Sequence, residues 1–329
     1  MHLHHLPLLI CPTCQASLRV AQTQSQEGQR LLEGTLQCTS CPRQYPVRGA
    51  VPRFVPAENY SSSFGYQWIL HARTQYDSFT QIPISRQRLF QETRWPEKLN
   101  GQTVLEVGSG SGRFTEVLAT TEATIVSLDF SLAVEANAKS NAAKPNVLIV
   151  QGSVYELPFQ KKSFDRVLCL GVLQHTPDPY RSFQALVEAL RPGGDLAIDV
   201  YRWRWINWLW PRYWLRTLTK HLPSAFLYTA CARYIEWVWP LTRWLHRLPQ
   251  GRKLNRFILV PDFRDIYPLS EELLKQWAIL DTFDNLSPTY DQPQRLSTVQ
   301  RWFRDHRLEP SEVHYGINGI EGRGRAPLT

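Results

Sequence analysis

Residues 104–114 read VLEVGSGSGRF, an apolar stretch that runs directly into a turn with three glycines. The apolar residues predict a buried strand. Gly108, Gly110 and Gly112 allow the backbone to turn tightly and to approach a ligand closely, because glycine has no Cβ. The next strand-like stretch ends at Asp129, whose carboxylate can accept hydrogen bonds from ribose hydroxyls. Strand, glycine turn, helix, strand and acid together predict a nucleotide site in a doubly wound α/β sheet.

The glycine spacing separates two kinds of nucleotide. The G-x-G-x-x-G pattern of dinucleotide sites needs a glycine where this chain has Arg113, and the glycines here follow G-x-G-x-G instead. Glu106 precedes them by two residues, and a carboxylate there suits a ligand with an amino group and a sulfonium better than two phosphates. The pattern resembles motif I of the class I S-adenosylmethionine (SAM)-dependent methyltransferases, whose cofactor has no pyrophosphate.

The resemblance continues in three later loops. Gly152–Val154 match the family's loop after the third strand. Gly171–His175 match its turn after the fourth strand, and Arg191–Gly194 match its turn before the fifth. The resemblance implies a Rossmann-like α/β fold with a mostly parallel, doubly wound seven-stranded sheet, and SAM as cofactor. Ser153 departs from the family pattern, which has an acid there. The cofactor-binding residues that the resemblance implies are Glu106, Gly108, Ser109, Gly110, Gly112, Asp129, Phe130, Gly152, Ser153, Val154 and Leu170.

Two C-x-x-C motifs precede this core. Two such turns can place four thiolates around one ion, which is the tetrahedral coordination that zinc prefers. Four sulfur ligands leave no open position, so we expect a structural Zn²⁺ bound by Cys11, Cys14, Cys38 and Cys41. A pair of disulfides is the alternative, which a cytoplasmic location would disfavour. The module, residues 1–56, resembles the zinc ribbons of bacterial large-subunit rRNA guanine methyltransferases and the small zinc-ribbon activator of tRNA and translation-factor methyltransferases.

Residues 57–100 connect the expected zinc ribbon to the core. Ser61–Ser63 predict a short flexible joint. The aromatic and amide-rich residues that follow resemble the lead-in of a bacterial group of zinc-ribbon methyltransferases, a segment that commonly folds over the cofactor. We therefore expect Gln67, Trp68 or Tyr76 to line the active site, with plain packing of the aromatic rings as the alternative.

A long insertion follows the fifth expected strand. In the family a helix and an antiparallel strand pair come soon after that strand, whereas here they are expected only from Ser297 onward. We therefore assign residues 101–201 and 297–329 to the SAM-binding domain and residues 202–296 to a mainly helical insertion beside the reacting centre, which we interpret as a substrate cap. Within it, Leu280–Pro293 crowds acids, hydroxyls and prolines and predicts an irregular functional loop.

The first part of the insertion is rich in tryptophan and positive charge. Residues 201–256 contain eleven Lys or Arg residues, one acid (Glu236) and eight of the twelve tryptophans of the chain. Three interpretations stay open: a cap whose tryptophans pack inward, a surface for anionic lipid, and a surface for RNA. No uncharged stretch is long enough to span a bilayer, so we expect a cytoplasmic protein, with peripheral membrane contact under the second interpretation. The tryptophans are Trp203, Trp205, Trp208, Trp210, Trp214, Trp237, Trp239 and Trp244.

The expected function is that of a SAM-dependent methyltransferase. A sulfonium methyl is already activated, so the protein mainly aligns the acceptor and excludes water, and a base is needed only for a hydroxyl or a protonated amine. Our candidates are His175 as the base and Tyr290 and Asp291 as substrate contacts. The chain has Leu170–Leu173 where adenine and glutamine N-methyltransferases carry an Asn-Pro-Pro-Tyr motif, which argues against those acceptors. We expect a small-molecule acceptor, glycans and lipid-linked metabolites included; an rRNA or tRNA methyltransferase and a non-catalytic protein-interaction module are the alternatives.

Overall fold

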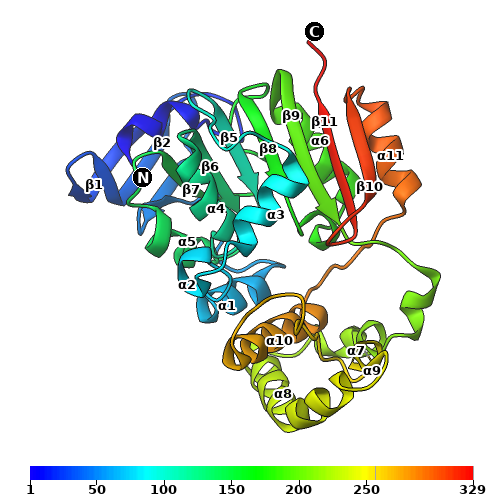
Figure 1. Ribbon diagram of the computed structural model, residues 1–329. Coiled ribbons are helices and arrows are strands. Elements are labelled where there is room, and N and C mark those ends of the chain that lie inside the picture. The colour runs from blue at the N-terminus through cyan, green and yellow to red at the C-terminus, as the bar shows by residue number, and fades with distance from the viewer. Residues whose placement is uncertain (256, 329) are drawn as a thin grey trace.

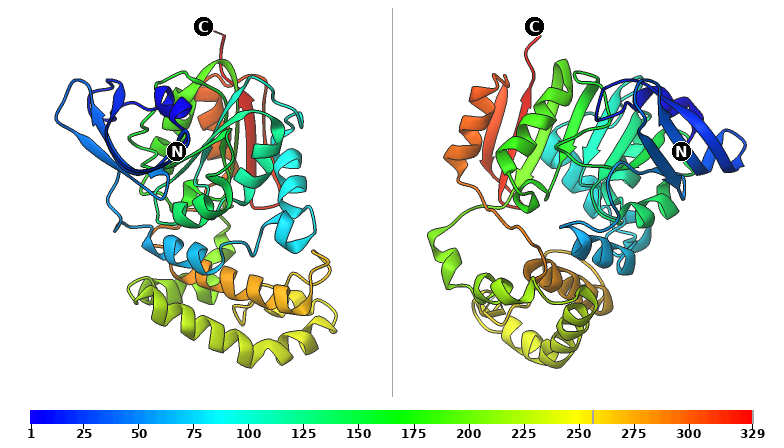
Figure 2. Two further views of the ribbon diagram at one scale, coloured as in Figure 1. Left: turned by 90° about the vertical axis from the view of Figure 1, so that its left-hand side faces the viewer. Right: turned by 180° about the vertical axis from the view of Figure 1, so that it is seen from behind.

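The structure is a computed structural model that describes residues 1–255 and 257–328 (Figure 1). A seven-stranded sheet with helices on both faces forms its centre, and a four-stranded sheet lies at one edge of it. The helical insertion forms a separate layer below the ends of the central strands in the view of Figure 1, and Figure 2 shows the same layer from two other sides. The predicted α/β class is therefore confirmed.

The central sheet determines where a ligand can bind. Its strands are β5 (Thr103–Val107), β6 (Thr124–Asp129), β7 (Val147–Gln151), β8 (Phe164–Cys169), β9 (Leu190–Val200), β10 (Ser311–Tyr315) and β11 (Ile320–Arg325). Their order is β10-β11-β9-β8-β5-β6-β7, in which β5 to β9 are parallel and β11 is antiparallel to both of its neighbours. The chain leaves β5 toward β7 and then returns to the other side of β5 as β8. Such a reversal opens a crevice at the carboxyl ends of the strands.

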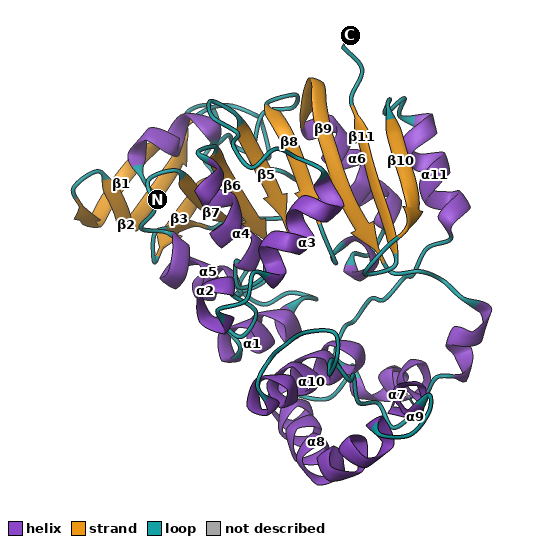
Figure 3. Cartoon of the chain, viewed as in Figure 1, coloured by secondary structure: helices purple, strands orange, loops and turns teal. Residues whose placement is uncertain are grey.

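Helices cover both faces of the central sheet (Figure 3). They are α3 (Ile84–Thr93), α4 (Arg113–Leu118), α5 (Val134–Asn141), α6 (Pro179–Ala189) and α11 (Leu296–Asp305). Leu89 of α3 and Phe114 of α4 belong to the hydrophobic cluster on one face, and Phe183 of α6 and Phe303 of α11 belong to the cluster on the other. Because both faces are covered, β7 is buried along its whole length.

The N-terminal module is an antiparallel sheet that is fixed to the edge of the central one. Its elements are η1 (Leu3–Leu8), β1 (Leu18–Glu27), β2 (Arg30–Cys38), β3 (Gln44–Arg48) and β4 (Val51–Pro52). After β4, Arg53 forms a parallel bridge with Gln151 of β7, and the Phe54 amide donates to the Gln151 carbonyl at 2.8 Å. The Ile10 amide donates to the Pro158 carbonyl at 2.9 Å. The module therefore packs as part of the same body as the central sheet.

The lead-in and the insertion are built from helices, as predicted for the insertion. Their elements are α1 (Ser62–Leu70) and α2 (Asp77–Thr80) in the lead-in, and η4 (Trp205–Leu209), α7 (Pro211–Thr219), α8 (Ser224–His246), α9 (Gly251–Asn255) and α10 (Glu271–Leu286) in the insertion. α10 contacts both α8 and α1, so it lies between the insertion and the lead-in. None of the helices in the described residues is long and apolar enough to cross a membrane.

Two predictions of irregular structure are wrong. Ser61–Ser63 do not form a flexible joint, because α1 begins at Ser62 and the side chain of Asn59 accepts hydrogen bonds from the Ser61 amide and hydroxyl at 3.0 and 2.6 Å. The first half of Leu280–Pro293 is not a loop, because α10 continues to residue 286 and Phe283 is buried in a cluster with α8. Only the residues after α10 are irregular.

The interpretation of tryptophans packed inward is wrong for most of the set. Trp239 is buried, and Trp210 is half-buried. Five others have 42% to 80% of their surface exposed, and these are Trp203, Trp205, Trp214, Trp237 and Trp244. The Trp208 side chain and Arg256 lie outside the described residues. The two surface interpretations, lipid and RNA, are left.

Candidate functional site

A cavity of about 720 Å³ lies at the carboxyl ends of the parallel strands, between the central sheet and the insertion. Its wall includes the glycine turn after β5, the end of β6, and residues of α1 and α10. Residues 170–176, 201–213 and 259–267 also contribute to it. Its volume lies within the range of small-molecule pockets, roughly 300 to 1,000 Å³. One continuous cavity therefore joins the predicted cofactor loop to the predicted substrate cap.

The glycine turn has the backbone conformation that its sequence predicts. Gly108 and Gly110 have φ angles of +78° and +54°, in the left-handed region that favours glycine. The Gly108 amide donates to the Leu128 carbonyl at 2.7 Å, and the Gly110 amide donates to Oδ2 of Asp129 at 2.8 Å. The turn is thus held against the end of β6, and its backbone forms part of the cavity wall.

Asp129 lies where the sequence places it, in the cavity wall at the end of β6. Its Oδ1 accepts hydrogen bonds from the Ser131 amide at 2.8 Å and the Ser131 hydroxyl at 2.7 Å. Burial raises the pKa of Asp129 above its usual value, although the Ser131 and Gly110 hydrogen bonds oppose this shift. These bonds hold the carboxylate in place in the cavity wall.

Glu106 lies beneath the glycine turn and outside the cavity wall. It is 2% exposed, and the Thr115 hydroxyl donates to its Oε2 at 2.5 Å. Burial raises the pKa of Glu106 to about 7. Gly112 and Ser153 are also absent from the wall, so a cofactor contact of these three residues stays a prediction. The other predicted cofactor residues line the cavity, namely Gly108, Ser109, Gly110, Asp129, Phe130, Gly152, Val154 and Leu170.

The lead-in covers the glycine turn. A Cβ placed on Gly110 would lie 3.0 Å from Nε1 of Trp68, so the indole lies directly against the turn. Gln67 and Trp68 line the cavity, whereas Tyr76 lies outside its wall and donates a hydrogen bond to the Ser111 carbonyl. The expectation of a lining role is met by two of the three candidates, and Tyr76 supports the loop from behind.

The lead-in also contacts the insertion. Nε2 of His71, at the end of α1, lies 2.7 Å from the Tyr228 hydroxyl of α8. Trp277 of α10 donates from Nε1 to the Thr74 carbonyl at 3.1 Å. The helix that carries Trp68 is therefore bound on its other side to the insertion.

His175 is part of a buried polar cluster on the insertion side of the cavity. Its Nδ1 lies 2.9 Å from the Tyr290 carbonyl. Because a carbonyl only accepts, Nδ1 carries the proton, and Nε2 is the basic nitrogen of the neutral ring. The rings of His175 and Tyr201 meet edge-on at 5.4 Å, and the Tyr201 hydroxyl donates to Oδ2 of Asp284 at 3.4 Å. All three side chains line the cavity.

Asp281 and Asp284 are functional candidates that the sequence analysis missed. Both project from α10 into the cavity wall, one turn apart. Burial raises the pKa of Asp281 to about 7, and it also raises the pKa of Asp284, against the opposing field of His175. The available signal was two acids three residues apart among the apolar residues Ile279, Leu280 and Phe283, since buried carboxylates cluster at functional sites.

Tyr290 and Asp291 lie beside the cavity but not in its wall. Asp291 forms a buried ion pair with Arg216 of α7. The Tyr290 ring packs edge-on against Tyr60 at 5.4 Å, and its carbonyl binds His175. These contacts position α7 and the imidazole, and a direct contact of either side chain with the substrate stays a prediction.

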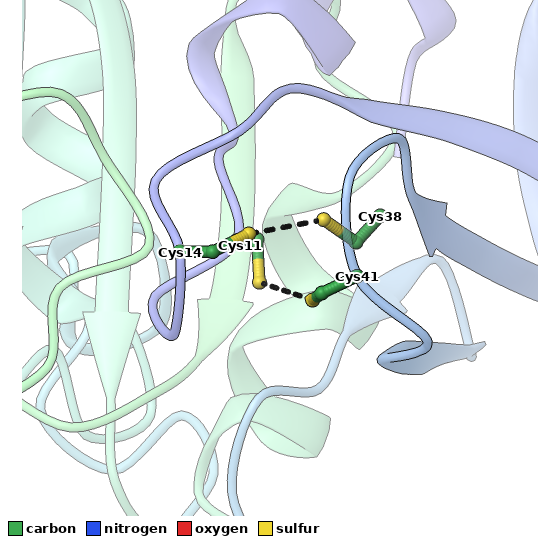
Figure 4. A group of neighbouring side chains, drawn as sticks. All are labelled: Cys11, Cys14, Cys38 and Cys41. Atoms are coloured by element: carbon green, nitrogen blue, oxygen red, sulfur yellow. Dashed lines mark hydrogen bonds between the residues drawn. The ribbon is translucent and has the colours of Figure 1, made fainter.

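The four cysteines of the N-terminal module form a compact cluster (Figure 4). Their Sγ atoms all lie within 4.8 Å of one another, with 3.7 Å between Cys11 and Cys41 and 3.4 Å between Cys14 and Cys38. These separations are too long for disulfides, whose sulfurs are about 2.05 Å apart. They fit one tetrahedral zinc ion, since Zn–S bonds of about 2.3 Å place the sulfurs roughly 3.8 Å from one another. None of the four lines the cavity, in agreement with a structural metal.

Comparisons with known proteins match the central sheet. A family model described as "Methyltransferase domain" matches residues 105–198. The ubiquinone biosynthesis O-methyltransferase of Cronobacter sakazakii is 30% identical over 187 residues, which cover 54% of this chain and 77% of that protein. The protein of the same name from Escherichia coli strain K12 is 29% identical over 147 residues, covering 43% of this chain and 61% of that protein.

Solved structures give more distant similarities. A Haloferax volcanii complex that contains the Trm112 methyltransferase activator has a TM-score of 0.44 and 13% identity, covering 80% of this chain and 97% of that chain. A SAM-dependent methyltransferase from Methanosarcina mazei has a TM-score of 0.41 and 15% identity, covering 74% and 98%. The segment that the family model matches contains the glycine turn, Asp129 and His175.

Proposed function

This chain belongs to the class I SAM-dependent methyltransferases, and from that premise we propose that it methylates a small-molecule acceptor held beneath the helical insertion. The observation that carries the proposal is the single cavity that runs from the glycine turn to the cluster of His175, Tyr201 and Asp284. Methyl transfer requires a shared space, because acceptor and cofactor must be aligned with each other.

The residues on the cofactor side fit SAM. When bound there, SAM supplies a methyl group that is activated by attachment to a sulfonium. The Asp129 carboxylate faces the cavity and would accept hydrogen bonds from the ribose hydroxyls. Phe130 and Val154 offer an apolar wall for the adenine, and the left-handed backbone at Gly108 and Gly110 lines the cavity beside them.

The residues on the other side suit a hydroxyl acceptor. A hydroxyl must lose its proton as it is methylated, and Nε2 of His175 is the basic nitrogen that the Tyr290 carbonyl leaves available. The imidazolium that forms would be stabilised by the nearby Asp284 side chain. Burial raises the pKa of Asp284, and the charge of His175 opposes this shift, so the charged imidazole favours the carboxylate form. The Cronobacter sakazakii relative is named as an O-methyltransferase, which supports the same class of acceptor.

The remaining wall favours an acceptor with a ring or an apolar chain. Aromatic side chains from the insertion line this part of the cavity, among them Tyr213, Phe263 and Trp277. Such side chains supply apolar contact area and fixed geometry. Together with Asp281 they describe a site for a molecule with a polar reacting end and an apolar body, which a lipid-linked metabolite or an aromatic ring would satisfy.

The first test is cofactor binding, measured by isothermal titration with SAM. We expect the wild-type protein to bind one SAM and Asp129→Ala to bind it at least about tenfold more weakly, a loss of about 1.4 kcal/mol. Glu188→Ala removes an exposed acid that does not line the cavity and should bind as the wild type does. A correctly folded wild-type protein that does not bind SAM would refute the proposal and favour a non-catalytic interaction module.

The second test is the class of acceptor. The protein is incubated with SAM that carries a tritiated methyl group and with three pools from cells of its source: a lipid extract, an aqueous metabolite extract and protein-free RNA. We expect the label in the lipid or metabolite pool and a strong loss with His175→Gln, which removes the basic nitrogen. Label in RNA would establish the alternative of an rRNA or tRNA methyltransferase.

A further inference from the structure

α7 is an amphipathic helix that lies in the reverse of the usual orientation. Its polar residues face the protein: Arg212 donates to Oδ1 of Asn285 at 2.6 Å, and Arg216 pairs with Asp291. Its apolar residues face outward, with 41% to 72% of their surface exposed, and these are Trp214, Leu215 and Leu218. A helix on the surface of a globular protein normally packs its apolar face on the core. In α7 most of the apolar surface is exposed instead.

α8 has a second exposed apolar stripe. Its inward face is buried in the insertion through residues that include Leu227, Ile235 and Trp239. On the opposite face, Trp237, Leu241, Trp244 and, just beyond the helix, Leu248 follow one another three or four residues apart and are 37% to 80% exposed. Phe226, 62% exposed, lies about three helical turns before Trp237 on the same face. α8 therefore has apolar residues on two faces; one face packs inside the insertion, and the other is exposed.

Both helices belong to the helical layer that lies below the ends of the central strands in Figure 1. They are joined by residues 220–223, which include exposed Leu222. We call this surface the apolar docking face; it consists of Trp214, Leu215, Leu218, Leu222, Phe226, Trp237, Leu241, Trp244 and Leu248. Exposed apolar clusters of this kind mark surfaces that contact a partner or a membrane.

The charge around the apolar docking face indicates what covers it. Residues 201–256 carry eleven basic side chains and one acid. Lys220, Arg233 and Arg247 are exposed beside or within the two apolar stripes. Indoles prefer the depth of the lipid headgroups, and Lys and Arg beside them attract anionic lipid. A second copy of this chain would instead bring two strongly basic surfaces together, which is unfavourable.

We propose that α7 and α8 dock this protein on the surface of an anionic lipid bilayer, with the apolar docking face inserted at headgroup depth and the surrounding Lys and Arg side chains bound to lipid phosphates. The helices lie on the membrane and do not cross it. This proposal stands on the exposed face alone and does not depend on which acceptor is methylated.

The test is co-sedimentation with vesicles of phosphatidylcholine, with or without an equal part of phosphatidylglycerol. We expect at least about tenfold tighter binding to the anionic vesicles, with a blue shift of tryptophan emission. Binding should weaken when salt is raised from about 0.1 to 1 M, which shortens the Debye length from about 10 to 3 Å. Leu218→Ala/Trp237→Ala, which truncates one residue of each helix, should lose roughly tenfold or more in affinity.

The matched control is Ile69→Ala/Phe79→Ala, which truncates two exposed apolar residues of the lead-in and should bind vesicles as the wild type does. Circular dichroism and thermal unfolding verify that both double variants are folded. No binding of the wild type at low salt, or equal binding by Leu218→Ala/Trp237→Ala, overturns the proposal. Two other outcomes would also overturn the proposal. If the wild type forms a dimer in solution and only Leu218→Ala/Trp237→Ala abolishes it, the face binds a second copy of the chain. If the wild type retains ribosomal RNA and only that variant loses it, the face binds RNA.

Discussion

Replacing Glu106 with glutamine tests the charge of the acid beneath the glycine turn. The carboxyl is buried, accepts one hydrogen bond from Thr115, and has no partner among the described residues for its Oε1. Burial raises the pKa of Glu106 from 4.5 to about 7. In that pH window the folded protein holds a proton that the unfolded chain has lost, so the free energy of unfolding falls as the pH rises.

The size of the effect follows from the two pKa values. Their difference, 4.5 against about 7, is about 2.5 units, and at about 1.4 kcal/mol per unit the destabilisation is on the order of 3 kcal/mol. It is absent below the unfolded pKa, grows through the window and is complete above the folded pKa. Glutamine has nearly the same shape and does not titrate. We therefore expect Glu106→Gln to match the wild type near pH 4.5 and to be more stable by up to about 3 kcal/mol near pH 8.

The measurement is urea unfolding of both proteins between about pH 4.5 and pH 8 without added SAM, with the difference in free energy plotted against pH. Glu188→Gln changes an exposed acid and should give a nearly flat difference. If Glu106→Gln is less stable than the wild type at pH 8, the native carboxylate is charged and favourably bound, and the reasoning from burial fails.

Two further substitutions test the cofactor loop and the metal. Gly101 and Gly108 both have positive φ, but a Cβ has open space at Gly101 and would lie 2.2 Å from Cγ2 of Val172 at Gly108. Both alanine variants incur roughly 1–2 kcal/mol of backbone strain, and only Gly108→Ala should weaken SAM binding, by at least about tenfold in calorimetry. Cys38→Ser should remove the zinc and lower the melting temperature by several degrees, whereas Cys231→Ser, outside the cluster, should retain one zinc per chain in elemental analysis.

The features that could be predicted from the sequence are those formed by residues close together in the chain. The glycine turn, the acid after the second strand and the two cysteine pairs depend on residues a few positions apart, and all of them lie where they were expected. Partners distant in the chain were not predictable. The ion pair of Asp291 with Arg216, seventy-five residues earlier, could not be predicted, and the substrate contact predicted for Asp291 stays a prediction. For the same reason the sequence alone could not tell which way the tryptophans face.

The composition of a segment also predicted the wrong secondary structure where buried apolar residues determine it. Acids and a threonine between Leu280 and Leu286 indicated a loop, yet the apolar residues among them are at helical spacing and are buried. The sequence also could not tell to which face of the sheet the Glu106 side chain points, because successive residues of β5 point to opposite faces. The hydrogen bond from Thr115 of α4 identifies that face in the structure.

The position of the lead-in couples the two ends of the cavity. Trp68 lies against Gly110, while the same segment is tied through His71 and Thr74 to Tyr228 and Trp277 of the insertion. If the insertion moved away from the central sheet, the lead-in would move with it and the Trp68 indole would leave the glycine turn. A movement of the insertion away from the sheet would therefore uncover the cofactor side and the acceptor side of the cavity together.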